Sequence, residues 1–76
     1  MLGSTLLMKG DHAAAVDALE LAIRLNPDQH VNHYNLGMAL EKLGRPDAAI
    51  QHYEDCLDLT PDTLQARQRL EFLQNR

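Results

Sequence analysis

Two pairs of side chains in this sequence have residue types and spacings that could support chemistry. His52 and Cys56 are four residues apart, so on a helix the imidazole and the thiol could touch, the minimum for a thiolate nucleophile. His30 and His33 are three residues apart, a spacing that can hold a metal ion. No third group is evident to orient His52 or to complete a metal site. We therefore expect a buried structural thiol, exposed histidines, no metal and no cofactor.

Other signatures of catalysis are missing from the sequence. It contains no Gly-rich phosphate loop, no zinc-type pairing of cysteines and no G-x-S-x-G turn. The charged residues Glu41-Lys42, Glu54, Asp55 and Asp58 predict solvated helix surface. We therefore expect that the chain is not an enzyme.

Composition limits the expected partners and compartment. The net charge of −4 argues against nucleic acid, because non-specific binding needs a basic face. No stretch approaches the roughly 20 apolar residues of a membrane span, and the amino terminus lacks the pattern of a secretory signal. The single cysteine cannot form an internal disulfide, which fits a reducing compartment. For these 76 residues we expect a single cytoplasmic domain that binds neither nucleic acid nor membrane.

The chain repeats itself at a fixed interval. Pro27 and Pro61 are 34 residues apart, and much of the sequence before each of them matches at that interval. Such a period is typical of stacked-repeat proteins, whose units bury their apolar faces on one another. The identical pairs include Leu2 and Leu36, Gly3 and Gly37, Leu6 and Leu40, Gly10 and Gly44, Glu20 and Glu54, and Leu25 and Leu59.

The apolar spacing is helical throughout and predicts about five helices. Asp11 is the expected cap of the second helix, while Asn26 should be the N-cap of the third with Pro27 as its first helical residue. Short connections make consecutive helices antiparallel neighbours. The expected helices are a short one ending at residues 9–10, then about 12–25, about 28–43 ending at Gly44, Pro46 to near Thr60, and from Thr60-Pro61-Asp62 to about 74.

Residues 30–63 closely resemble a tetratricopeptide repeat, residues 1–29 resemble the same repeat truncated at its start, and residues 64–76 resemble its capping helix. The resemblance implies an all-α fold of antiparallel helix pairs, stacked as a short right-handed α-solenoid. Gly37 and Ala49 are small where two helices cross closely, and Tyr53 and Leu36 fill the space beside them. The matching residues are Leu36-Gly37, Leu40, Gly44, Ala49, Tyr53 and Pro61, with Cys56 at a small-residue position and His33 where the family often has Trp.

The resemblance also implies a scaffold that binds a peptide or partner protein in a concave groove, as part of a larger repeat protein. The apolar residues of this groove would form an exposed strip. Such a strip usually marks a partner site, although some of its members could instead pack on neighbouring helices. The residues carried onto that groove are Leu7, Met8, Val31, Tyr34, Asn35, Met38, Lys42, Arg69 and Phe72.

Three alternatives stay open at this point. Asn35 and Arg69 stand where some family members carry a carboxylate clamp, but Gln65 replaces a basic clamp residue, which favours ordinary surface residues. The uncapped first helix, with Met1, Leu2, Leu6 and Leu7 near the contact, could form a homodimer. The chain could also be an accessory domain of a larger enzyme.

Overall fold

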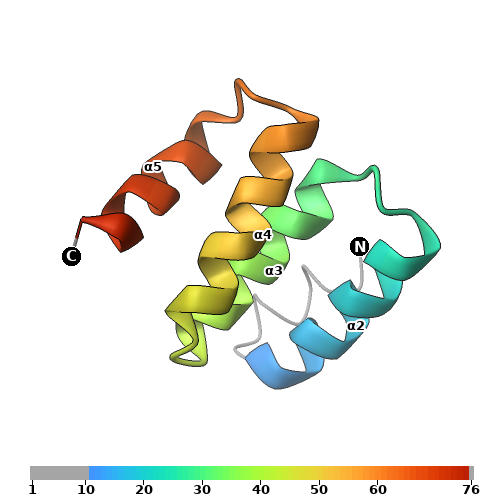
Figure 1. The fold of residues 1–76 in the computed structure, drawn as a ribbon. Helices are drawn as coiled ribbons and strands as arrows, with labels where there is room; N and C mark the ends of the chain where they lie inside the picture. Colours follow the sequence, from blue (N-terminus) through green and yellow to red (C-terminus); the bar gives the residue numbers. More distant parts are fainter. Residues whose placement is uncertain (1–10, 76) are drawn as a thin grey trace.

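The computed structural model describes residues 11–75, and over this range the chain forms helices joined by short turns (Figure 1). No strand occurs between residues 11 and 75, and no helix there is long and apolar enough to cross a membrane. The all-α prediction is confirmed, while the first expected helix lies outside the described residues. The helices are α2 (His12–Leu25), α3 (His30–Lys42), α4 (Pro46–Leu59) and α5 (Leu64–Gln74).

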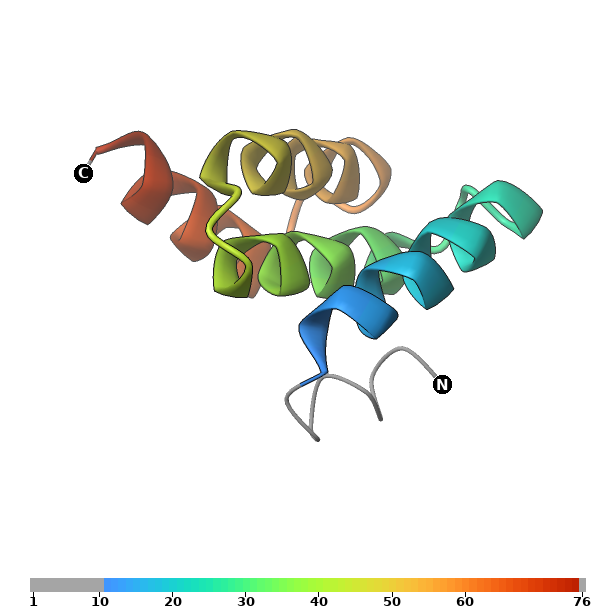
Figure 2. The same cartoon turned by 90° about the horizontal axis from the view of Figure 1, so that it is seen from below.

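Each helix packs mainly on its neighbours in the chain. Helix α3 contacts both α2 and α4, and α5 packs on α4 (Figure 1). Seen from below, α3 and α4 lie one above the other, with α2 and α5 at opposite ends (Figure 2). Because α3 and α4 both have partners on more than one side, they supply most of the buried residues.

Several helix ends follow the local signals in the sequence. Asp11 caps α2 by accepting a hydrogen bond from the backbone N–H of Ala14 at 3.1 Å. Pro46 is in the first turn of α4, where its missing N–H leaves no hydrogen bond unmade. Gly44 follows α3 with a φ of +76°, the left-handed conformation that commonly ends a helix. These start and stop predictions are confirmed.

The predicted start of α3 is wrong by a few residues. The N–H of Asn26 donates to the carbonyl of Ala22 at 2.9 Å, so Asn26 closes α2 and does not open α3. Pro27 then lies in the turn that reverses the chain, and α3 begins at His30 with Gln29 as its N-cap. The same correction applies one repeat later. Thr60 closes α4, and α5 begins at Leu64.

The left-handed conformation of Gly44 makes a simple prediction. Gly44→Ala is expected to lower the free energy of unfolding by about 1 kcal/mol, because an L side chain is strained at this φ. A Cβ at this position would meet nothing within 4 Å, so packing adds no further cost. Urea unfolding followed by circular dichroism measures the change. Gly44→Asn should cost less, because asparagine tolerates this conformation; equal costs would contradict the explanation.

The core is continuous across all four helices. Tyr53, Leu19, Leu36 and Cys56 are its largest fully buried side chains. The burial of Cys56 confirms the prediction of a structural thiol, and the same burial raises the pKa of that thiol. The buried apolar residues are Ala15, Val16, Leu19, Leu36, Ala39, Leu40, Ala49, Tyr53, Cys56, Ala66 and Leu73.

Helices α3 and α4 approach each other closely where Gly37 meets the ring of Tyr53. A Cβ built on Gly37 would lie 2.7 Å from Cε1 of Tyr53, closer than real Cβ atoms approach a neighbour. The tyrosine ring therefore occupies the space that a side chain at Gly37 would need. The close crossing expected at Gly37, with Tyr53 beside it, is therefore confirmed. The contact between these two residues sets the register of α3 against α4.

Candidate functional site

The surface between α3 and α5 contains two hollows, one at each end of α3. We call them the Phe72 hollow, of about 500 Å³, and the Val31 hollow, of about 300 Å³. The Phe72 hollow is lined by Glu41, Lys42, Gly44, Pro46, Arg69, Phe72 and Leu73. The Val31 hollow is lined by His30, Val31, Tyr34, Thr63 and Gln65. Both ends of this surface thus offer concave space beside exposed apolar side chains, since Phe72 is 60% and Val31 42% exposed.

An ion pair between α3 and α5 lies beside the Phe72 hollow. Arg69 donates from Nε to Oε1 of Glu41 at 3.2 Å and from Nη2 to Oε2. The Glu41 side chain was expected to be solvated, but it is only 10% exposed because it pairs with Arg69, so the pair is partly shielded from water. The guanidinium carbon of Arg69 also lies 5.1 Å from the centre of the Phe72 ring, within cation–π range. The fork of Arg69 is therefore already used by a carboxylate within the chain.

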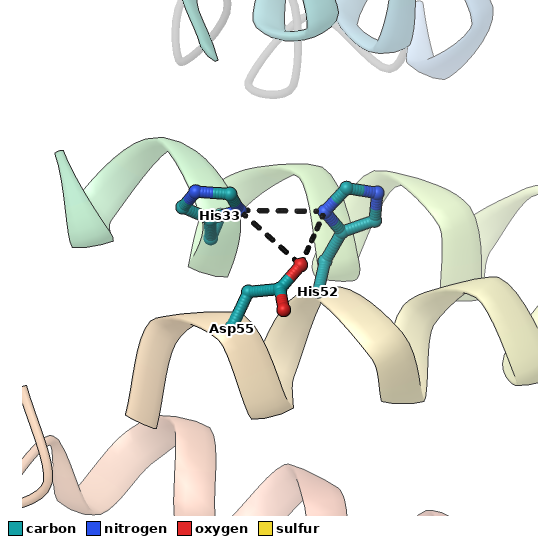
Figure 3. A group of neighbouring side chains, drawn as sticks. All are labelled: His33, His52 and Asp55. Carbon is teal, nitrogen blue, oxygen red and sulfur yellow. Dashed lines mark hydrogen bonds and ion pairs between the residues drawn. The ribbon is translucent and has the colours of Figure 1, made fainter. Parts of the chain in front are cut away.

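A second cluster of polar side chains joins α3 to α4 (Figure 3). Nδ1 of His33 lies 3.4 Å from Nδ1 of His52, and each of these nitrogens is 3.9 Å from Oδ2 of Asp55. The imidazole rings are stacked, with centroids 5.7 Å apart. On its other side, Nε2 of His33 lies 3.1 Å from the carbonyl oxygen of Pro27. We call His33, His52 and Asp55 the histidine cluster.

The histidine cluster corrects two expectations. His33 was expected to be exposed, and it is 8% exposed because its ring stacks on His52 and hydrogen bonds to the turn before α3. Asp55 was expected on a solvated face, but it is half-buried and faces both imidazoles. Burial lowers the pKa of His52, although the nearby carboxylate of Asp55 acts in the opposite direction. His30 lies apart from the cluster and lines the Val31 hollow.

The family model described as tetratricopeptide repeat matches residues 2–74. The chain belongs to the tetratricopeptide repeat family. The resemblance inferred from the sequence is therefore confirmed. Tetratricopeptide repeats form a protein-interaction fold that is generally non-enzymatic.

Individual tetratricopeptide repeat proteins resemble this chain over most of its length. It is 35% identical over 69 residues to the peroxisomal targeting signal receptor of Saccharomyces cerevisiae. It is 36% identical over 69 residues to the tetratricopeptide repeat and J domain-containing co-chaperone DNJ1 of Cryptococcus neoformans var. grubii. These matches cover 91% and 90% of this chain but only 11% and 13% of the two relatives. The chain thus spans only about an eighth of the length of each of these curated relatives.

The solved structure of MamA has the same fold. The two superpose with a TM-score of 0.92 at 35% sequence identity, over 95% of this chain and 42% of MamA. This agreement confirms the short stack of antiparallel helices predicted for a tetratricopeptide repeat.

The structure brings some of the predicted groove residues together and separates others. Met38 is half-buried against the core, and Asn35 is buried within α3, so neither lines a hollow. Leu7 and Met8 lie outside the described residues, as do the other residues expected at a dimer contact. Binding by any of these residues stays a prediction. The five that line the two hollows are Val31, Tyr34, Lys42, Arg69 and Phe72.

Sequence reasoning missed the histidine cluster, although a usable signal was present. Gly37 and Tyr53 were expected to meet, which sets α3 against α4 in an antiparallel register. One turn before Gly37 comes His33, which in this register lies near the segment of α4 that contains Asp55. The register gives the level of these residues along the two helices, while the rotation of each helix, which the register does not give, decides that the three side chains face one another.

Proposed function

We propose that this tetratricopeptide repeat chain binds a peptide segment of a partner protein on the surface between α3 and α5. The observation that carries the proposal is the exposure of Phe72, a large aromatic side chain at the edge of a hollow of about 500 Å³. Exposed aromatic residues beside concave space are favoured anchors in protein interfaces. Its relatives are named as a targeting signal receptor and a co-chaperone, and both names are consistent with binding to other proteins.

The charges around the Phe72 hollow indicate which peptide would fit. Glu41 and Arg69 neutralise each other, so Arg69 does not present a free fork to a carboxylate. An apolar peptide side chain can instead pack on Phe72, while Lys42 is exposed at the rim. We infer that the partner is anchored by an apolar side chain and not by a terminal carboxylate. We also propose that the chain contributes binding and no catalysis to any larger protein that contains it.

The test begins with a displayed library of peptides of random sequence, selected against the 76-residue chain. For a selected peptide, Phe72→Ala is expected to raise the dissociation constant about fivefold to thirtyfold, because truncating an aromatic anchor commonly costs about 1–2 kcal/mol. Fluorescence anisotropy with a labelled peptide measures the change. Light scattering at each concentration establishes whether the chain is a monomer or the alternative homodimer during the titration.

The matched control is Leu25→Ala, which removes an apolar side chain that is 77% exposed on α2, away from both hollows. Leu25→Ala should leave peptide affinity unchanged, and Val31→Ala should weaken it if the peptide also reaches the second hollow. Arg69→Ala is a poorer test, since it would leave the shielded carboxylate of Glu41 without its partner. Peptides that bind the Phe72→Ala variant as tightly as the unmodified chain would overturn the proposed site.

A further inference from the structure

We propose that His33, His52 and Asp55 bind a divalent transition-metal ion between α3 and α4, with Zn²⁺ as the reference metal (Figure 3). One donor atom from each residue lies within 4.8 Å of the other two. None of the three residues lines the Phe72 hollow or the Val31 hollow, so the site is separate from the proposed peptide surface.

The distances between the donor atoms fit a zinc ion with little rearrangement. Zinc–nitrogen bonds of about 2.0–2.1 Å in a tetrahedral site place two nitrogen ligands roughly 3.3–3.4 Å apart. The two Nδ1 atoms of His33 and His52 are 3.4 Å apart. Oδ2 of Asp55 lies 3.9 Å from each, so this carboxylate has to approach by roughly half an ångström to reach tetrahedral geometry. The Asp55 side chain is 35% exposed and has the freedom to make that movement.

The turn before α3 orients one of the ligands. The carbonyl of Pro27 can only accept a hydrogen bond, so the contact at 3.1 Å requires the proton of His33 to be on Nε2. Nδ1 of His33 then carries a lone pair directed at the other two donors. Ligating histidines usually have a backbone carbonyl or a carboxylate on the opposite ring nitrogen in this way, which sets the tautomer before the metal arrives.

Metal binding would change the tautomer of His52, because its imidazole contacts that of His33 when no metal is bound. Since Nδ1 of His33 is an acceptor, His52 must carry its own proton on Nδ1 to donate across the 3.4 Å contact. A metal ion bound between them needs the lone pair on Nδ1 of His52. The proton of neutral His52 therefore has to move to Nε2, with no net proton released by this ring.

The ligand types select the class of metal. Two imidazoles and one carboxylate suit Zn²⁺ and its neighbours in the first transition row, whereas Mg²⁺ and Ca²⁺ prefer sites built from oxygen ligands. Three protein ligands leave a fourth tetrahedral position for a water molecule or another external ligand. The predicted site therefore holds one transition-metal ion per chain with an open coordination position.

The direct test is calorimetric titration of the 76-residue chain with Zn²⁺, followed by ¹⁵N spectra of the histidine rings. We expect one Zn²⁺ per chain, with the Nδ1 resonances of His33 and His52 shifted and the rings of His12 and His30 unchanged. Mg²⁺ at the same concentration should produce neither effect. The absence of bound Zn²⁺, or shifts at His12 and His30 in place of the cluster, would overturn the proposal.

Substitutions separate this site from adventitious binding. Asp55→Asn and His52→Gln should each weaken Zn²⁺ binding by more than about tenfold, since even the groups that support metal ligands contribute 10–100-fold to affinity. The matched controls are Asp58→Asn, an exposed carboxylate on the same helix, and His30→Gln, a histidine on α3 outside the cluster. Both controls should bind as the unmodified chain does. Equal affinity of all four variants would place the metal elsewhere and refute the site.

A thermal measurement keeps the test valid if a variant is less stable. A ligand that binds only the folded chain raises the melting temperature, so Zn²⁺ should raise that of the unmodified chain and of Asp58→Asn. The rise should be clearly smaller for Asp55→Asn, whatever its starting stability. A zinc-dependent rise in Asp55→Asn equal to that of the unmodified chain would contradict the proposal.

Discussion

Tyr53→Ala is expected to lower the free energy of unfolding by about 3–5 kcal/mol, the usual cost of removing a large buried aromatic side chain. Tyr53 is fully buried, packs on Gly37, and its ring centroid lies 5.8 Å from that of Tyr34. Small domains have net stabilities at or below the usual range of about 5–15 kcal/mol, so this loss should unfold much of the population at 25 °C. Urea and thermal unfolding followed by circular dichroism measure it.

Tyr53→Phe is the matched control, because it keeps the ring and removes only the hydroxyl. That hydroxyl is buried and makes no well-formed hydrogen bond within the described chain, although Glu41 and Arg69 lie close enough to influence it. Burial also raises the pKa of Tyr53, so the side chain stays neutral at physiological pH. We expect Tyr53→Phe to change stability by less than about 1 kcal/mol. If it were as damaging as Tyr53→Ala, the hydroxyl and not ring packing would hold α3 against α4.

Gly37→Leu is the second substitution with a large expected effect. Even a Cβ at this position would lie 2.7 Å from the ring of Tyr53, and that ring is fully buried and cannot swing outwards. Overpacking a core usually costs about 1–3 kcal/mol and occasionally more, and a four-carbon side chain here should exceed that range. We expect an expanded or unfolded chain, with loss of near-ultraviolet circular dichroism and of the unfolding transition.

A double-mutant cycle makes the cause of this effect measurable in folded variants. Gly37→Ala gains about 0.5–1 kcal/mol from helix propensity, so any net destabilisation must come from the contact with Tyr53. In a Tyr53→Leu background the aromatic atoms are gone, and Gly37→Ala should become less destabilising by more than about 0.5 kcal/mol. The same cost in both backgrounds would show that the ring does not set the crossing distance.

Local sequence was sufficient to predict the helices and much of the core. The starts of α2 and α4 follow from Asp11 and Pro46, and the end of α3 follows from Gly44, because capping depends on residues within one turn. The starts of α3 and α5 were predicted too early. Asn26 can cap either the helix before it or the helix after it, and the packing of antiparallel neighbours, not its residue type, decides between them.

The repeat also determined which small and large residues meet. The resemblance to the tetratricopeptide repeat implied that Gly37 lies at a close helix crossing with Tyr53 in the space beside it, and the structure has them there. One hydrogen bond recurs with the repeat as well. His33 donates to the carbonyl of Pro27, and 34 residues later Arg67 donates to the carbonyl of Pro61. Backbone geometry that recurs at a fixed period can be predicted from the sequence because each unit repeats the same local contacts.

The polar contacts between helices were decided only by the tertiary structure. Glu41 and Arg69 pair across 28 residues, and His33 and His52 meet across 19, at positions whose residue types are compatible with solvent exposure. The sequence alone determined the period, the helices and the buried crossing, because these depend on local spacing and on side-chain size. The tertiary structure decided which charged side chains and which histidines face one another, because that depends on the register and rotation of separate helices.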